Sequence, residues 1–384
     1  MRPIVGSARG AAGAGTVHFC MGRRPPCTPR YSGRTSQDAV LNSRVPVWNA
    51  AVRRTLLLMP LLALAGVGTL TPRRTRANEI TTIAFGVITT STVEETRSAW
   101  EPFFAAMRSA TSLDVRGIYH ATYEAAVDAV VTNLVQVAWV SNKAALDCIE
   151  RANVEVFAQL VDSAHSPGYR SIIIARRDSP LQSVEQLLAR PRQYRFAMGE
   201  ASSTSGSVMP SYALFVPRGI RPEEHFLTLQ RGTHAQTVEA VLSGRVHAGV
   251  WNTEEQLRMR ATAPQRLQQL KVLWESALIP KDPLLWRRDL PLSVRNRISA
   301  YIFGVGRTPA EKSMLASMFD LAGFQRSSNG QLKFVLDIED FKQRSEVLLD
   351  SNMSESRKSE RLADLRERYE RLSRTIQSGP DSAR

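Results

Sequence analysis

The segment "YRFAMGEASSTSGSVMPSYALF" (residues 194–215) contains the pattern that decides the fold. An apolar strand at 194–200 is followed by four hydroxyl residues and then by an apolar stretch, which indicates a helix beginning near Gly206. Strand, loop and helix in this order form the repeating unit of an α/β sheet, where ligands bind beyond the carboxyl ends of the strands. A Ser/Thr cluster beside glycine is also an ordinary loop or helix cap, so both interpretations stay open here.

The same alternation of strands and helices extends along the chain from residue 79. Apolar runs predict strands at 81–88, 114–120, 136–141, 154–161, 170–177, 194–200, 247–252 and 270–276. Helical patterns lie between them at 93–109, 122–134, 183–190 and 235–243. The length of 384 residues is enough for two domains, each with its own core. The sequence therefore predicts an α/β protein.

The net charge of +14 is concentrated at the front of the chain. Residues 1–77 hold 12 Arg, no Lys, one Asp and no Glu, which leaves 38 basic and 35 acidic residues over 78–384. A net charge of only +3 over that main part gives no electrostatic footprint for nucleic acid, and we predict no nucleic-acid partner.

The segment "VRRTLLLMPLLALAGVGTL" (residues 52–70) has the features of an export signal. Two arginines precede an apolar run, and "TRA" at Thr75–Ala77 provides a small-residue cleavage site, which predicts a periplasmic protein cleaved near Ala77. An uncleaved anchor is the alternative, and the paired arginines do not separate the general export route from the twin-arginine one. Residues 1–50 show no periodic pattern, so we expect translation to begin nearer Val47 or Val52.

The hydroxyl residues of the opening segment could bind an anion. Ser203, Thr204 and Ser205 offer three hydroxyls and helix N-terminal N–H groups to one tetrahedral anion, with Gly206 allowing close approach. No lysine follows, so the segment is not a nucleotide-binding P-loop.

Further candidates lie at the ends of other predicted strands. His234 follows a strand predicted at 227–232, and Glu254 follows the strand at 247–252. Tyr123, Tyr169 and Asp282 also occupy junctions between predicted elements. Each of these residues, taken singly, is an ordinary structural residue: a satisfied histidine, a first-turn acid, a rim tyrosine or a turn aspartate.

Neither an enzyme nor a metal site is indicated. Ser203, His234 and Asp282 could suggest a hydrolase triad, but the G-x-S-x-G motif is absent. His234 and His247 have no cysteine or acid at a spacing typical of a metal site. After the predicted cleavage Cys148 is the single cysteine, which excludes an internal disulfide in the mature chain.

The C-terminal segment predicts an amphipathic helix. Apolar residues recur at a 3-4-3-4 spacing on a background of Arg and Glu. They are Leu362, Leu365, Tyr369, Leu372 and Ile376. Such a seam packs on its own domain or mediates self-association, and the second alternative predicts a homodimer through the C-terminal helix.

Four blocks in order give the chain a family resemblance. "VFAQLVDSAHSPGYRSIIIARRDSP", "ASSTSGSVMPSYALF", "NTEEQLRMR" and "LIPKDPLLWRRDLP" resemble the periplasmic substrate-binding proteins of phosphonate ABC transporters. The resemblance spans about Ile80 to Ile338. It implies a two-lobed class II binding-protein fold with two crossovers at the hinge, a phosphonate between the lobes, no reaction and no cofactor. The implied partners are an inner-membrane permease and its ATPase.

The resemblance also assigns site residues. It implies that the phosphonate group contacts Ser203, Thr204, Ser205, His234 and Tyr123. In members that bind 2-aminoethylphosphonate, the ammonium group meets two acids and a tyrosine, which are here Glu254, Asp282 and Tyr169. The implied ligand is an aminoalkylphosphonate. Phosphate, phosphite or another phosphonate is the alternative, as is a periplasmic sensor subunit with the same fold.

The predicted organisation follows from these patterns. It comprises a leader at 1–50, an export signal at 51–77, lobe one at 78–168 and 277–340, lobe two at 169–276, and a C-terminal helical tail at 341–384.

Overall fold

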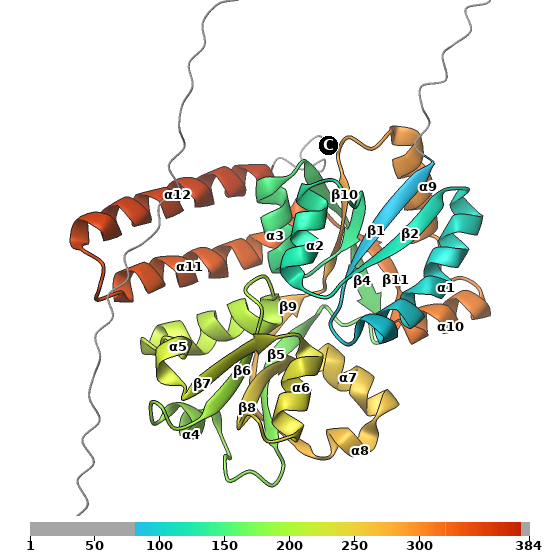
Figure 1. Ribbon diagram of the computed structural model, residues 1–384. Helices are drawn as coiled ribbons and strands as arrows, with labels where there is room; N and C mark the ends of the chain where they lie inside the picture. The colour runs from blue at the N-terminus through green and yellow to red at the C-terminus, as the bar shows by residue number, and fades with distance from the viewer. Residues whose placement is uncertain (1–80, 319, 378–384) are drawn as a thin grey trace, which may run out of the picture. The chain divides into compact units, whose positions relative to one another are not determined.

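The computed structural model describes residues 81–318 and 320–377, whose strands form two separate sheets (Figure 1). The first, in lobe one, has the order β11-β4-β10-β3-β1-β2, and the second, in lobe two, has the order β7-β6-β8-β5-β9. Lobe one contains β1 (Thr82–Ile88), β2 (Asp114–His120), β3 (Val137–Trp139), β4 (Val154–Asp162), β10 (Pro283–Arg287) and β11 (Leu321–Arg326). Lobe two contains β5 (Gly168–Arg176), β6 (Arg195–Gly199), β7 (Thr228–Gly232), β8 (Ala248–Asn252) and β9 (Leu270–Pro280).

Both sheets are mixed. In lobe one β1 pairs in parallel with β2 and β3, whereas β10 and β11 run antiparallel to their neighbours. In lobe two β6 is parallel to β7 and β8, and β5 is antiparallel to β8 and β9. The predicted α/β, two-lobed fold class is confirmed.

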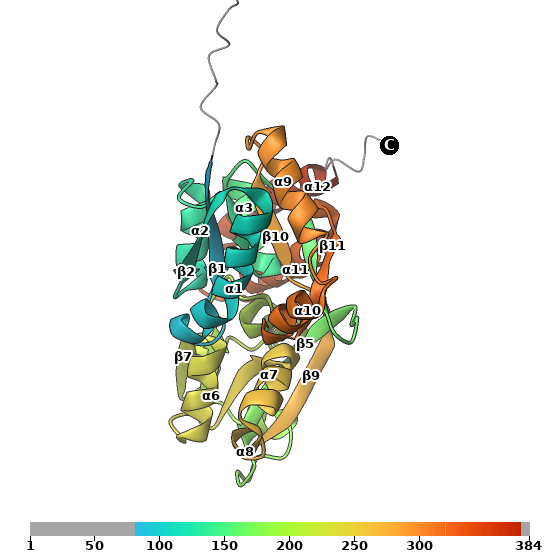
Figure 2. The same ribbon diagram turned by 90° about the vertical axis from the view of Figure 1, so that its right-hand side faces the viewer.

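Helices connect the strands within each lobe (Figures 1 and 2). Those of lobe one are α1 (Val93–Thr111), α2 (Tyr123–Val131), α3 (Asn142–Arg151), α9 (Leu292–Ile302) and α10 (Pro309–Ser317). Those of lobe two are α4 (Val184–Leu188), α5 (Pro222–His225), α6 (His234–Leu242), α7 (Thr253–Thr262) and α8 (Pro264–Leu267). Short irregular helices are η1 (Thr204–Val208), η2 (Ser211–Phe215), η3 (Val216–Arg218) and η4 (Asn329–Leu332).

Aromatic side chains fill a separate core in each lobe. In lobe one Trp100 and Phe104 of α1 pack against Phe85 of β1, with ring centroids 5.1 to 5.8 Å apart. In lobe two Phe196 of β6 stacks on Phe226 at 4.3 Å. Because each lobe buries its own aromatic cluster, each can keep its shape while the two move relative to one another.

The chain passes between the two sheets twice. It leaves β4 at Asp162 and enters β5 at Gly168, and it returns from β9 at Pro280 to β10 at Pro283. Lys281 and Asp282 form the return connection, and both are buried. Residues from the two connections are thereby brought to the interface between the lobes.

The opening segment folds as β6 followed directly by an irregular helix. Helix η1 begins at Thr204, two residues before the predicted start, and Ser203 caps it by accepting the N–H of Gly206 at 3.0 Å. A Cβ atom on Gly206 would lie 2.8 Å from the Cα of Gly199, so glycine is needed where the helix crosses the end of the strand. The turn at η1 is π-helical, a form that is common at functional sites.

The C-terminal residues form a hairpin of α11 (Lys333–Leu349) and α12 (Glu355–Gln377), which lie side by side in Figure 1. Leu365, Leu372 and Ile376 of the predicted seam are buried within the chain, and Leu372 and Ile376 join the core of lobe one. The seam therefore packs on its own domain, as the first alternative had it. Leu362 and Tyr369 of the seam are half-buried, and a homodimer through the C-terminal helix stays a prediction.

The predicted leader and export signal lie outside the described residues. Within residues 81–318 and 320–377 no helix has the length and apolar character needed to span a bilayer.

Candidate functional site

A cavity between the lobes is surrounded by the starts of helices from both sides. Tyr123 and His234 are the first residues of α2 and α6, and Ser203 is the N-cap of η1. Helix N-termini carry partial positive charge, so the end of the cavity formed by Tyr123, Ser203 and His234 favours an anion. We refer to it as the anion end. The lining side chains are Thr90, Tyr123, Trp139, Ser141, Leu160, Tyr169, Ser203, Ser205, His234, Asn252, Glu254, Glu255, Asp282 and Leu321.

Lobe two contributes a hydrogen-bonded group of hydroxyl, imidazole and amide. The Ser205 hydroxyl lies 3.2 Å from Nε2 of His234, and the Asn252 side chain donates to it at 3.4 Å. Burial lowers the pKa of His234, partly opposed by the charge of Glu255. A neutral imidazole beside a hydroxyl can donate or accept, and this group can therefore orient donors toward an anion oxygen.

Thr204 does not face the cavity. Its hydroxyl is fully buried and accepts the backbone N–H of Lys143, at the start of α3 in lobe one, at 2.8 Å. The neighbouring Ser202 donates to Asp147 of α3 at 2.9 Å and accepts from Ser141 through its carbonyl at 2.7 Å. The side chain of Thr204 thus serves contact between the lobes, whereas Ser203 and Ser205 reach the cavity.

Lobe one supplies Tyr123 to the same end of the cavity. A side-chain hydrogen bond joins Tyr123 to Ser203, and burial raises the pKa of the tyrosine well above its usual value, so it stays protonated. The backbone N–H of Tyr123 is occupied by Glu200 of lobe two, 2.8 Å away. The tyrosine therefore offers its hydroxyl, and not its N–H group, to a ligand.

The opposite end of the cavity is acidic. Asp282 is 5% exposed, and its carboxylate accepts from the hydroxyl of Tyr169 at 3.1 Å and from the amide of Asn142 at 3.2 Å. Burial raises the pKa of Asp282 well above its usual range, and the charge of Glu254 raises it further. Among the described residues no cation forms an ion pair with Asp282 at 4.0 Å or less, and the charge of the neighbouring Lys281, which pairs with Glu254 and Asp162, lowers the pKa of Asp282 by less than burial raises it.

Glu254 differs because it already has a cation. The ammonium group of Lys281 lies 2.7 Å from Glu254 and 2.7 Å from Asp162, and the lysine side chain is only 5% exposed. Burial would lower the pKa of Lys281, but the two carboxylates outweigh it and the pKa is raised. Burial raises the pKa of Glu254 while Lys281 opposes the shift. The two acids of the predicted amine site are therefore unequal.

The chain matches a protein family over most of this structure. Residues 85–332 match the family model described as "ABC transporter, phosphonate, periplasmic substrate-binding protein". The chain belongs to this family. It is the periplasmic phosphonate-binding component of an ABC transporter, a transport protein and not an enzyme, and its partners are a small-molecule ligand and the membrane permease with its ATPase.

Individual relatives agree with the family. The phosphonates-binding periplasmic protein of Escherichia coli (strain K12) is 31% identical over 290 residues, which cover 76% of this chain and 85% of the relative. A binding protein component of an ABC phosphonate transporter from Pseudomonas aeruginosa superposes with a TM-score of 0.73 at 33% identity, over 78% of this chain and 99% of that one. PhnD1 from Prochlorococcus marinus, solved with methylphosphonate, shares the fold with a TM-score of 0.61 at 20% identity, over 68% and 97%.

Several residues that line the cavity were not among the candidates predicted from the sequence. Thr90, Ser141, Asn252 and Glu255 line the cavity, and Lys281 stands behind Glu254. Ser141 and Asn252 are the last residues of predicted strands and Thr90 lies two residues beyond one, which is the signal in the sequence that could have found them. Seven of the eight predicted side chains lie at the cavity: Ser203, Ser205, His234, Tyr123, Glu254, Asp282 and Tyr169.

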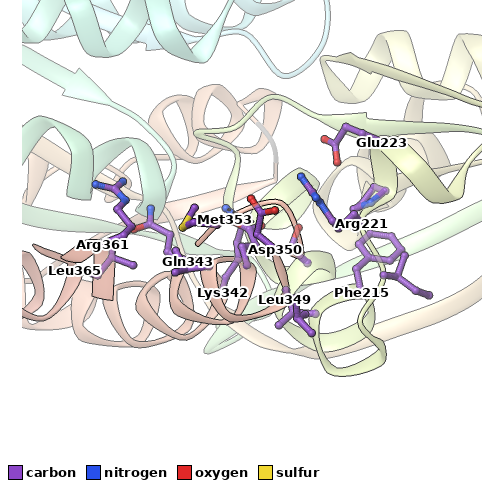
Figure 3. A pocket seen from close by; sticks show the side chains of 16 residues that line it. Phe215, Arg221, Glu223, Lys342, Gln343, Leu349, Asp350, Met353, Arg361 and Leu365 are labelled. Carbon is purple, nitrogen blue, oxygen red and sulfur yellow. Dashed lines mark ion pairs between the residues drawn. The ribbon is translucent and has the colours of Figure 1, made fainter. Parts of the chain in front are cut away.

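A second hollow lies between lobe two and the C-terminal hairpin (Figure 3). Phe215, Arg221 and Glu223 line it from lobe two, and residues of α11 and α12, including Lys342 and Arg361, line it from the hairpin. We refer to it as the hairpin groove.

Proposed function

We propose that the cavity binds an aminoalkylphosphonate, with 2-aminoethylphosphonate as the best fit, and that the protein delivers this ligand to the permease. The buried carboxyl group of Asp282, which forms no ion pair within the described residues, supports an ammonium ligand. A buried charge without a partner is costly, and a ligand cation removes that cost on binding. Tyr169, which donates to Asp282, then orients the acid toward the ammonium group.

The other end of the cavity suits the phosphonate group. Ser203, Ser205, His234 and Tyr123 are all at least 97% buried and surround one end of the cavity, close to three helix N-termini. Charge-assisted hydrogen bonds contribute about 1.5 to 3 kcal/mol each. A few such bonds at each end reach the roughly 8 kcal/mol of a micromolar complex.

Titration calorimetry with four ligands tests the proposal. We expect 2-aminoethylphosphonate to bind more tightly than ethylphosphonate, ethylphosphonate to bind like methylphosphonate, and phosphate to bind most weakly. Ethylphosphonate is the matched control because it differs from the proposed ligand by the amino group. Equal affinity for the two ethyl compounds would contradict the assignment of the amine and leave a phosphonate receptor of another specificity.

We also propose that the export signal at 51–77 is cleaved near Ala77. The predicted lobe boundaries at 168/169 and 276/277 fall inside β5 and β9, so we propose boundaries in the two connections instead, at 163–167 and 281–282. N-terminal sequencing of periplasmic protein tests the cleavage site, with Asn78 as the expected start. Recovery of residues 1–50 in that fraction would refute it.

A further inference from the structure

The loop that joins β1 to α1 contains a buried hydroxyl with no partner. Thr90 is 8% exposed, lines the cavity, and its Oγ1 atom has no hydrogen-bond partner among the described residues. A buried unsatisfied hydroxyl costs about 1 to 3 kcal/mol. Most buried hydroxyls in proteins avoid this cost, so one that faces a binding cavity points to a partner supplied by the ligand.

Thr90 stands at the anion end of the cavity. Across the cleft its carbonyl accepts the N–H of Ala235 at 3.3 Å, and Ala235 follows His234 in α6. Two residues further along, Thr92 caps α1, a helix of 19 residues, by accepting from the N–H of Glu95. The positive end of this helix therefore adjoins the Thr90 side chain.

Other donors of lobe one are already engaged. The first N–H group of α2 is occupied by Glu200, which fills the place that an anion would take at that helix. The hydroxyl of Ser91 is hydrogen-bonded to the hydroxyl of Thr96 inside the lobe. Among the described hydroxyls of lobe one that line the cavity, Thr90 Oγ1 is the one with no hydrogen-bond partner.

We propose that the Thr90 hydroxyl donates a hydrogen bond to a phosphonate oxygen and so completes the anion site from lobe one. This inference rests on the proposed function, since it requires a phosphonate in the cavity. Thr90 and Tyr123 hold the anion from one lobe while Ser203, Ser205 and His234 hold it from the other. The anion then connects the two lobes, and the contact at Thr90 forms only when they are closed.

Thr90→Val tests the contact because it removes the hydroxyl, keeps the shape and leaves the backbone bond to Ala235 intact. We expect affinity for methylphosphonate and for 2-aminoethylphosphonate to fall by about tenfold each. The loss should appear as faster dissociation in stopped-flow measurements, since a contact made on closure slows release. Thr90→Ser, which restores the hydroxyl, should recover most of the affinity.

Thr89→Val is the matched control. Thr89 is 3% exposed and its hydroxyl also lacks a partner among the described residues, but it does not line the cavity. We expect the Thr89→Val variant to bind both ligands as tightly as the natural protein does.

Wild-type affinity in Thr90→Val, or an equal loss in Thr90→Ser, would overturn the inference while phosphonate binding by the natural protein stands. Binding of no phosphonate by the natural protein would instead overturn the proposed function and the inference with it. Thr90→Ala gives the same readout should the valine variant not fold.

Discussion

The cleft cavity and the hairpin groove show which kind of hollow binds a ligand. The groove has a volume of about 470 Å³, against about 30 Å³ for the cavity. Yet the groove's charges are compensated by neighbours, such as Arg221 by Glu224 at 2.9 Å and Lys342 by Glu346 at 3.8 Å. In the cavity the Thr90 hydroxyl lacks a partner and the Asp282 carboxyl group forms no ion pair among the described residues. Unsatisfied polar groups, and not size, distinguish the binding site.

The largest effect should come from Asp282→Asn. This change keeps the shape and removes the carboxylate that pairs with the ammonium group in the complex, so affinity for 2-aminoethylphosphonate should fall by about 10- to 150-fold, the equivalent of about 1.5 to 3 kcal/mol. Methylphosphonate, which has no ammonium group, should bind at least as well as before. Calorimetry with both ligands measures the two effects. Glu275→Gln, in an exposed acid of β9 paired with Arg170, is the control and should change neither.

Glu254→Gln should cost less than Asp282→Asn. Because Lys281 already neutralises much of the Glu254 charge, we expect a loss of about fivefold for 2-aminoethylphosphonate, the equivalent of about 1 kcal/mol. Lys281 keeps Asp162 as its partner in this variant. An affinity loss equal to that of Asp282→Asn in the same calorimetric series would show that Lys281 does not reduce the attraction between Glu254 and the ammonium group of the ligand.

The affinity for 2-aminoethylphosphonate should change a few-fold with pH because Asp282 titrates. In the free protein burial and Glu254 raise its pKa, so the acid binds a proton that an ammonium ligand must displace. Affinity for 2-aminoethylphosphonate should therefore rise with pH and level off above the raised pKa. The difference between the natural protein and Asp282→Asn, measured with the same ligand from pH 5 to 8.5, cancels ionisation of the phosphonate itself. Parallel pH curves for the two proteins would contradict this linkage.

The smallest effect should come from the hairpin groove. Arg361 lines the groove, and its side chain is 57% exposed in a long contact with Asp364 at 3.9 Å. We expect Arg361→Ala to change the affinity for every phosphonate by less than about twofold, since exposed ion pairs contribute little. A tenfold loss would mean that the groove takes part in ligand binding, and the distinction between the two hollows would fail.

The sequence predicted strands correctly where a single short segment contains the whole residue pattern of a strand. Strands expected at 114–120 and 154–161 match β2 and β4 within a residue, because β-branched and aromatic residues recur along both segments. β10 and β11 were missed. β10 has five residues and starts at a proline, and β11 is an edge strand of mixed polarity with Gly323 in it. Neither presents an alternation long enough to detect.

The candidate site was predicted where strand ends determine position, and not where side-chain direction decides. Ser203, Thr204 and Ser205 are consecutive, but the Thr204 hydroxyl accepts the backbone N–H of Lys143 in lobe one, and only Ser203 and Ser205 reach the cavity. Lys281 was missed for another reason: its partner Glu254 is 27 positions away, and only the fold brings the two together.

The two chain connections between the sheets determine the order in which the ends of a ligand are bound. Lys281 and Asp282 lie in one connection, and Asp162 lies at the start of the other, so the acidic end of the cavity is at the axis about which the lobes rotate. Atoms near a rotation axis move least, and the acidic end therefore keeps its geometry when the lobes separate. The anion end is built from both lobes, with Thr90 and Tyr123 on one side and Ser203, Ser205 and His234 on the other, so it is taken apart on opening. An amine that lacks a phosphonate group can thus occupy the acidic end without drawing the lobes together, and only a molecule with both groups produces the closed form that a permease can recognise.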